Sequence, residues 1–223
     1  MARAATSHDA GTADLISTVD GTLDVIPHAG DSAMMDLNIS ADAIEAARGR
    51  LRGIAVRTPL VPLEVSGRAH PISLKLETLQ PVGSFKIRGA GSAITAAPRD
   101  RLSQGVYTAS AGNMAQGVAW CARALGVPCT VIVPDHAPAA KISAVERLGA
   151  TIIRVPIARW FQVLVERSYP GLDGLFVHPV SDPDVIAGNA TIASEILEDA
   201  PDTDTVLVPF GGGGLACGIA RGL

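Results

Sequence analysis

The sequence predicts an α/β protein built from repeated βα units. Short apolar segments without polar alternation recur along the chain, and such strands are typically buried on both faces of a parallel sheet. Each is followed by a stretch with helical apolar spacing, several of which end at a glycine. Hydrophobic residues make up 48% of the 223 residues and charged residues 18%, which allows a sizeable core.

The first part of the chain carries the weakest periodicity. Residues 1–37 are rich in small and polar residues, and we expect a poorly ordered extension there. A first helix is expected from Ser40, which is a good N-cap residue, to Gly53. An extended segment over 57–65 and a strand over 72–77 follow.

Strand and helix patterns then alternate as a parallel sheet requires. We expect strands over 105–110, 129–134, 151–156, 175–179 and 205–210. We expect helices over 113–125, 138–148, 158–168 and 184–198. A last helix should follow the glycines after residue 210.

Composition narrows the functional class. The formal net charge is −4 and no basic run is present, which argues against a nucleic-acid partner. No apolar run reaches the roughly 18 residues of a membrane span, and no signal peptide is visible. The three cysteines form no CxxC pair and no metal-like spacing with histidine. We therefore expect a cytoplasmic protein with a small-molecule ligand and no metal site.

The stretch PFGGGGLACGIA (209–220) predicts a phosphate site. Four consecutive glycines stand between a predicted strand and a predicted helix. Glycine backbone can bring several N–H groups together on an anion, and the helix N-terminus adds positive potential. The alternative is a flexible turn. Neither a Walker sequence nor GxGxxG is present, so a nucleotide is not favoured.

The loop TASAGNMAQG (108–117) also lies between a predicted strand and a predicted helix. Its small residues let backbone donors approach a ligand, and Ser110 and Asn113 add side-chain hydrogen bonds. Such a loop suits a carboxylate at a helix N-terminus. An ordinary N-cap or turn explains it equally well.

Lys86 stands between Phe85 and Ile87, with Gly83 and Gly89 nearby. A lysine that forms a Schiff base must lose its proton near neutral pH, which requires desolvation or a nearby cation. The alternative is a lysine that opens a helix on a solvated face. A phosphate site, a carboxylate loop and a sheltered lysine together describe an amino acid condensed with pyridoxal 5'-phosphate.

Four motifs carry a resemblance to a known family. ETLQPVGSFKIRGA (77–90), ASAGNMAQGVA (109–119), HPVSDPDVIAGNATIASEIL (178–197) and VPFGGGGL (208–215) occur in that family's order. The chain resembles the pyridoxal-phosphate-dependent serine/threonine dehydratases, of the tryptophan synthase β-like fold (fold type II).

This resemblance implies a two-lobed α/β enzyme with parallel-rich sheets flanked by helices. Residues 38–103 and 181–223 correspond to the large lobe, which is incomplete here, and 104–180 to a small mobile lobe. The family's catalytic domain normally continues beyond the position of Leu223, into the part that carries the pyridine-nitrogen partner. Cys217 lies too close to the glycine run to be that partner. His178 is expected to be structural.

The resemblance also assigns cofactor-binding roles. Lys86 corresponds to the lysine that forms the Schiff base and removes the substrate α-proton. Phe85 would pack against the cofactor ring, and Asn113 would hydrogen-bond its phenolic oxygen. The phosphate would bind the following residues: Gly211, Gly212, Gly213, Gly214 and Leu215.

The substrate carboxylate would be held by Ser110, Ala111, Gly112 and Asn113. The implied reaction removes water and then ammonia from L-threonine, L-serine or a related β-hydroxy amino acid, and gives a 2-oxo acid. A dimer or tetramer of identical chains is also implied. Two alternatives stay open: a truncated homologue that binds the cofactor weakly or is not catalytic, and a serine racemase-like or other β-elimination enzyme of the same fold.

Four positions depart from the family pattern. Ala111 replaces the serine that serine racemases carry, which favours elimination because no side-chain acid faces that side. Met114 stands where a histidine is common. Asn189 and Ala190 stand where glutamine and glycine are usual, and the added methyl group should tighten packing or lower activity.

Overall fold

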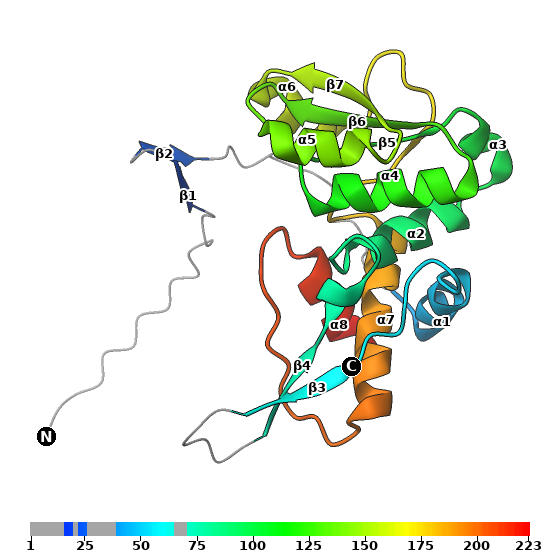
Figure 1. Ribbon diagram of the computed structural model, residues 1–223, viewed down its shortest axis with the longest axis vertical. Coiled ribbons are helices and arrows are strands. Elements are labelled where there is room, and N and C mark those ends of the chain that lie inside the picture. The colour runs from blue at the N-terminus through cyan, green and yellow to red at the C-terminus, as the bar shows by residue number, and fades with distance from the viewer. Residues whose placement is uncertain (1–15, 20–21, 26–38, 65–70) are drawn as a thin grey trace, which may run out of the picture. The chain divides into compact units, whose positions relative to one another are not determined.

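A computed structural model describes residues 16–19, 22–25, 39–64 and 71–223 (Figure 1). The chain divides into two units, residues 1–37 and residues 38–223, and each is described by itself. In the first unit, β1 (Ile16–Val19) pairs antiparallel with β2 (Thr22–Val25). The rest of the predicted extension lies outside the described residues.

The second unit begins with the predicted N-capped helix. In α1 (Ala41–Arg50) the Ser40 Oγ accepts a hydrogen bond from the Ala43 N–H at 3.1 Å, which confirms the cap. Gly53 follows with φ +79°, a left-handed conformation that ends a helix at little cost for glycine. Helix α1 packs against α7 and α2, which are described below.

An antiparallel hairpin follows α1. It consists of β3 (Leu60–Leu63) and β4 (Ile72–Lys75), with Leu60 opposite Lys75. The short 3₁₀ helix η1 (Glu77–Leu79) leads from β4 towards the segment that carries Lys86. The extended segment predicted over 57–65 and the strand predicted over 72–77 are thereby confirmed at β3 and β4, and the structure adds their pairing.

The central helix α2 (Lys86–Ala96) was not among the predicted elements. Its sequence, KIRGAGSAITA, buries Ile87, Ala90 and Ile94 completely, at helical spacing. Two glycines hide this pattern, and the structure explains both. A Cβ on Gly89 would lie 2.7 Å from the Val185 Cγ1 of α7, and one on Gly91 would lie 3.0 Å from the Cδ2 of Leu51 at the end of α1. Close helix crossing therefore replaces a continuous apolar stripe. The short helix α3 (Arg99–Ser103) comes next.

A parallel sheet forms the rest of the described βα repeats, with strand order β7-β6-β5-β8. Its strands are β5 (Val106–Ala109), β6 (Cys129–Pro134), β7 (Thr151–Val155) and β8 (Leu175–Phe176). One face packs on α4 (Asn113–Leu125) and α5 (Ala139–Glu146), and the other on α6 (Ile157–Glu166) (Figure 1). All four strands and all three helices were predicted, although β8 is shorter than expected.

Two further helices pack closely on each other. Asp182 caps α7 (Pro183–Asp199) by accepting hydrogen bonds from Asp184 and Val185 N–H. Helix α8 (Gly214–Gly222) lies directly on α7, and a Cβ on Gly218 would be 2.9 Å from the Ile186 carbonyl oxygen.

The strand expected over 205–210 is wrong as a secondary-structure assignment. The segment is neither helix nor strand, and no described strand pairs with it. Leu207 is 87% exposed and Phe210 70% exposed. An apolar sequence pattern becomes a strand only where a neighbouring strand supplies hydrogen bonds.

The predicted α/β fold class is nevertheless confirmed by the helix-flanked parallel sheet. Within the described part of the chain, no helix is long and apolar enough to cross a bilayer.

Candidate functional site

Lys86 occupies the first position of α2 and its side chain is sheltered. Its Nζ donates a hydrogen bond to the Pro179 carbonyl oxygen at 2.8 Å and lies 5.2 Å from the centre of the Phe85 ring. Burial lowers the pKa of Lys86, because the charged ammonium loses hydration. Gly117 of α4 lies against its backbone, where an added Cβ would be 3.2 Å from the Lys86 carbonyl carbon. Lys86 thus opens a helix, as the alternative interpretation expected, but its amine is partly buried and not fully solvated.

The glycine run, residues 211–214, reaches the same place from the other end of the chain. A Cβ on Gly212 would lie 2.7 Å from the Val180 Cγ2, and one on Gly214 would lie 2.6 Å from the Val180 carbonyl oxygen. Val180 follows Pro179, whose carbonyl accepts the Lys86 hydrogen bond. The glycine run and Lys86 thus meet at one short segment.

The conformation of the glycine run suits its sequence. Gly213 has φ +86°, which glycine adopts without strain, and it is the N-cap residue of α8. The Nδ2 of Asn189 donates to the Gly214 carbonyl oxygen at 3.2 Å, so α7 fixes the start of α8. Gly211 has open space where a side chain would stand. Backbone N–H groups at the N-terminus of a nine-residue helix offer positive potential to an anion.

Phe85 and Leu215 belong to one apolar cluster. Both are partly buried and pack against residues of α7 and α8. The buried members of this cluster are Ile192, Ala193, Ile196 and Ile219. The residue before Lys86 and the residue after the glycine run are thereby joined by apolar packing.

The loop 110–113 follows the carboxyl end of β5 and leads into α4. The Ser110 Oγ accepts a hydrogen bond from the Gly112 N–H at 3.2 Å, and a Cβ on Gly112 would meet nothing within 4 Å. Asn113 is exposed and begins α4, while Ala111 is partly buried. The same helix carries Gly117 against the Lys86 backbone, so α4 links this loop to the lysine.

Two of the atypical positions are packing residues. Met114 is 2% exposed and belongs to the core between α4 and the sheet. Ala190 is fully buried where α8 crosses α7, and a Cβ on Gly222 would lie 2.7 Å from its carbonyl oxygen. The backbone of Ala190 therefore lies within a tight helix crossing.

A buried ion network around Arg88, two residues after Lys86, was not predicted. Arg88 is 2% exposed and its guanidinium donates to both carboxylate oxygens of Glu77 and of Glu195, at 2.7 to 2.9 Å. Lys75 makes a further ion pair with Glu195 at 2.6 Å. The pKa of Arg88 is raised and that of Glu195 is lowered, because hydrogen bonds and charge attraction outweigh desolvation.

The network ties four elements together, and Lys75 contributes from β4. Glu77 belongs to η1, Arg88 to the first turn of α2 and Glu195 to α7. The sequence offered one signal, an arginine two positions after Lys86, but it contained nothing to show that the arginine is buried.

Orphaned polar atoms test whether a cofactor fits. Among the described residues, the buried side-chain atoms without a hydrogen-bond partner are Arg50 Nε, Ser84 Oγ and Asn189 Oδ1. Ser84 belongs to the loop that carries Lys86, and Asn189 bonds the glycine run. A partly buried amine, an unpartnered hydroxyl two residues before it and a helix N-terminus packed on the same turn fit the aldehyde and phosphate of pyridoxal 5'-phosphate.

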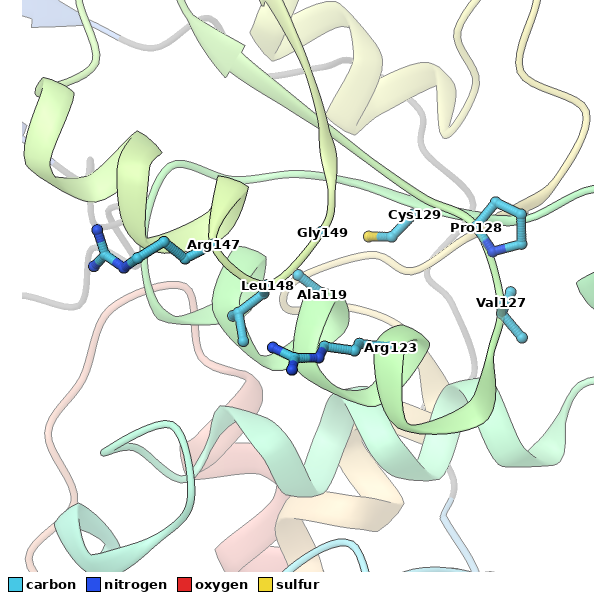
Figure 2. A pocket seen from close by; sticks show the side chains of 8 residues that line it. All are labelled: Ala119, Arg123, Val127, Pro128, Cys129, Arg147, Leu148 and Gly149. Carbon is cyan, nitrogen blue, oxygen red and sulfur yellow. The ribbon is translucent and has the colours of Figure 1, made fainter.

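A separate cavity of about 340 Å³ lies near the amino-terminal ends of strands β6 and β7 (Figure 2). Its lining consists of Ala119, Arg123, Val127, Pro128, Cys129, Arg147, Leu148 and Gly149. Cys129 begins β6, whereas Ser110 follows the carboxyl end of β5, so this cavity is distinct from the Lys86 site.

Residues 51–223 match the family described as "Pyridoxal-phosphate dependent enzyme". The chain belongs to this family. The family depends on pyridoxal phosphate, so the predicted cofactor is confirmed at the level of the family.

Individual relatives show which members of the family the chain resembles. L-threonine ammonia-lyase of Thermotoga maritima is 43% identical over 189 residues, which cover 82% of this chain and 46% of that protein. The solved threonine deaminase of T.th. superimposes with a TM-score of 0.72 and 34% identity, over 82% of this chain and 60% of that one. The solved serine racemase of maize superimposes with a TM-score of 0.72 and 34% identity, over 81% of this chain and 56% of that one. The resemblance to the serine/threonine dehydratases and their fold is confirmed.

The chain spans about half the length of the curated relatives that it matches, 46% of the proteins of Thermotoga maritima and Geobacter sulfurreducens.

Proposed function

We propose that the chain is part of a pyridoxal-phosphate-dependent ammonia-lyase that acts on L-threonine, L-serine or a related β-hydroxy amino acid. The observation that carries the proposal is the meeting of Lys86 and the glycine run at residues 179–180. A relative 43% identical is named L-threonine ammonia-lyase, which supports the reaction class. The substrate within that class rests on the resemblance.

Lys86 has two tasks in this proposal. As a neutral amine it would hold the cofactor through the aldehyde carbon, with loss of water, and its lowered pKa increases the neutral fraction available for that bond. With substrate bound, the Nζ would accept the substrate α-proton. The bound cofactor supplies an electron sink for the electrons that this proton leaves behind.

The remaining predicted residues bind and orient. Backbone N–H groups of the glycine run and of Leu215 hold the phosphate, and Phe85 packs beside the ring. The loop of Ser110 to Asn113 holds the substrate carboxylate, and Asn113 donates to the phenolic oxygen. These roles agree with the positions of the residues at a helix start and at the carboxyl end of β5.

The proposed reaction is an elimination followed by hydrolysis. Loss of the α-proton and the β-hydroxyl releases water, and hydrolysis then releases ammonia and leaves a 2-oxo acid. Ala111 offers no side-chain acid to return a proton to the opposite face, which disfavours racemisation. The solved serine racemase with similar fold keeps racemisation as the second candidate.

We further propose that the two lobes act as predicted. Residues 104–180, which contain the parallel sheet, form the mobile small lobe, and residues 38–103 with 181–223 form the large lobe. Closure of the small lobe on the substrate carboxylate would exclude water from the reacting atoms.

The test combines a spectrum with an assay. The purified chain is mixed with pyridoxal 5'-phosphate, its visible absorption is recorded, and 2-oxo acid is measured after addition of L-threonine or L-serine. Lys86→Ala should abolish both the visible band and the product, while Lys141→Ala, at an exposed position on α5, should leave both unchanged. A band without product supports the alternative of a cofactor-binding chain without turnover, and racemised substrate supports the second candidate.

A further inference from the structure

The segment that follows β8 begins at Val177, which makes two hydrogen bonds to β5. The Val177 N–H donates to the Tyr107 carbonyl oxygen at 2.8 Å, and the Thr108 hydroxyl donates to the Val177 carbonyl oxygen at 2.8 Å. Both partners belong to β5, so the sheet fixes the start of the segment. Residue 178 then begins a turn, which we call the 178–181 turn.

The His178 ring holds this turn together. Its Nδ1 accepts hydrogen bonds from the Val180 N–H at 3.1 Å and from the Ser181 N–H at 2.9 Å. A ring nitrogen that accepts from two backbone N–H groups carries no proton, so the hydrogen bonds require a neutral imidazole with the proton on Nε2.

The turn carries both halves of the candidate site. Its Pro179 carbonyl oxygen accepts the hydrogen bond from Lys86 Nζ. Its Val180 side chain and carbonyl stand against Gly212 and Gly214. A change in the backbone of residues 179 and 180 therefore moves the acceptor of the lysine and the support of the glycine run together.

Charges around His178 favour the neutral ring. Burial, Arg167 and Lys86 together lower the pKa of His178 from the ordinary value of 6.5 to about 4. Arg167 also donates to the Ser181 hydroxyl at 2.8 Å. The partly buried Asp182 carboxyl, whose pKa is raised by desolvation, caps α7 next to the turn. The Phe176 ring packs edge-on against the imidazole, with centres 6.0 Å apart.

We propose that His178 is a positioning residue, whose neutral ring holds the 178–181 turn so that Lys86 and the glycine run stay in register for the cofactor. This inference rests on the proposed function for its consequence, although the hold on the turn exists without any cofactor. Protonation of the ring removes the acceptor and frees the turn, so cofactor binding weakens when the ring is charged.

Two variants distinguish the role of His178 as a hydrogen-bond acceptor from a role in packing alone. His178→Asn places an amide oxygen close to the position of Nδ1, whereas His178→Leu keeps bulk and offers no acceptor. The matched controls are His136→Asn and His136→Leu, because the His136 side chain is 68% exposed on the loop between β6 and α5.

The first readout needs no cofactor. Amide hydrogen exchange at Val180 and Ser181 should speed up by about tenfold or more in His178→Leu, the loss expected for a broken hydrogen bond, and should stay near wild type in His178→Asn. Both His136 variants should leave these amides unchanged. Unchanged exchange in His178→Leu, or equally fast exchange in His178→Asn, overturns the proposal.

The second readout is the affinity for pyridoxal 5'-phosphate, measured from the visible band between pH 4 and 7. Wild type should lose affinity more steeply than His178→Asn as the pH falls towards about 4, because only wild type has a ring to protonate. Parallel pH curves for the two proteins overturn the proposal. If no variant and no wild type binds the cofactor, the proposed function fails, and the exchange measurement still decides the role of His178.

Should His178→Leu fail to fold, His178→Asn carries the test through the exchange rates and the pH curve.

Discussion

At the scale of single residues, the surroundings of two neighbouring positive groups, the partly buried Lys86 and the buried Arg88, shift their pKa values in opposite directions. Lys86 donates a hydrogen bond to a carbonyl oxygen, and burial lowers its pKa. Arg88, two positions later, is surrounded by carboxylates, and its pKa is raised. The arginine therefore stays charged and fixes the first turn of α2, while the lysine can release its proton.

Lys86 should titrate below the ordinary lysine value of 10.5, because burial disfavours its charged form. The rate of acetylation at Lys86 as a function of pH, followed by peptide mass analysis, gives the midpoint. Lys86→Arg removes the reactive group and serves as the control for assignment of the peptide. A midpoint at or above 10.5 would contradict the sheltered position of the amine.

Arg88→Met should destabilise the chain by ~3–5 kcal/mol, because two buried carboxylates lose their partner. Glu166→Gln, which breaks an ion pair with Arg159 at 2.9 Å on the surface, should cost under ~1 kcal/mol. Urea unfolding of the two variants gives both free energies. Similar costs would show that the Glu77 and Glu195 contacts contribute no more than a surface pair.

At the scale of elements, sequence patterns located helices and parallel strands well. Ser40 and Gly126 act locally, as an N-cap and as a left-handed C-cap with φ +67°, so they can be identified without knowledge of the fold. The prediction of a strand over 205–210 was wrong for the opposite reason. A strand needs a neighbouring strand to hydrogen-bond with, and a local sequence pattern does not show whether one is present. Helix α2 was missed because its glycines serve helix crossings.

Those crossings give a prediction about two glycines within helices. Gly188→Ala should destabilise the chain by ~1–3 kcal/mol, because the new Cβ would lie 2.4 Å from the Arg88 carbonyl oxygen and the helices must separate. Gly49→Ala should be neutral or stabilise by ~0.5–1 kcal/mol, because it meets nothing within 4 Å in α1. Thermal unfolding compares them, and equal effects would refute the close crossing of α2 and α7.

At the scale of the whole molecule, the four sequence motifs predicted which residues form the site, but not the contacts that hold these residues together. Lys86 and the glycine run are far apart in the sequence, and only their complementary chemistry and the family resemblance indicated that they lie together. Their physical link, the Pro179 carbonyl oxygen and the Val180 side chain, belongs to a turn whose sequence shows no sign of this role. The Arg88 network was equally hidden, because a charged residue is predicted to be exposed unless its partners are known.

The candidate roles of Lys86 and the glycine run can be tested in one measurement. The chain has three lysines, Lys75, Lys86 and Lys141. Pyridoxal 5'-phosphate is added, the lysine–cofactor bond is fixed by borohydride reduction, and the digested peptides are weighed. The account predicts cofactor mass on the Lys86 peptide, because Lys75 is held in its ion pair with Glu195 and Lys141 lies exposed on α5, away from the glycine run. Cofactor on either of the other two lysines, or on none, would contradict it.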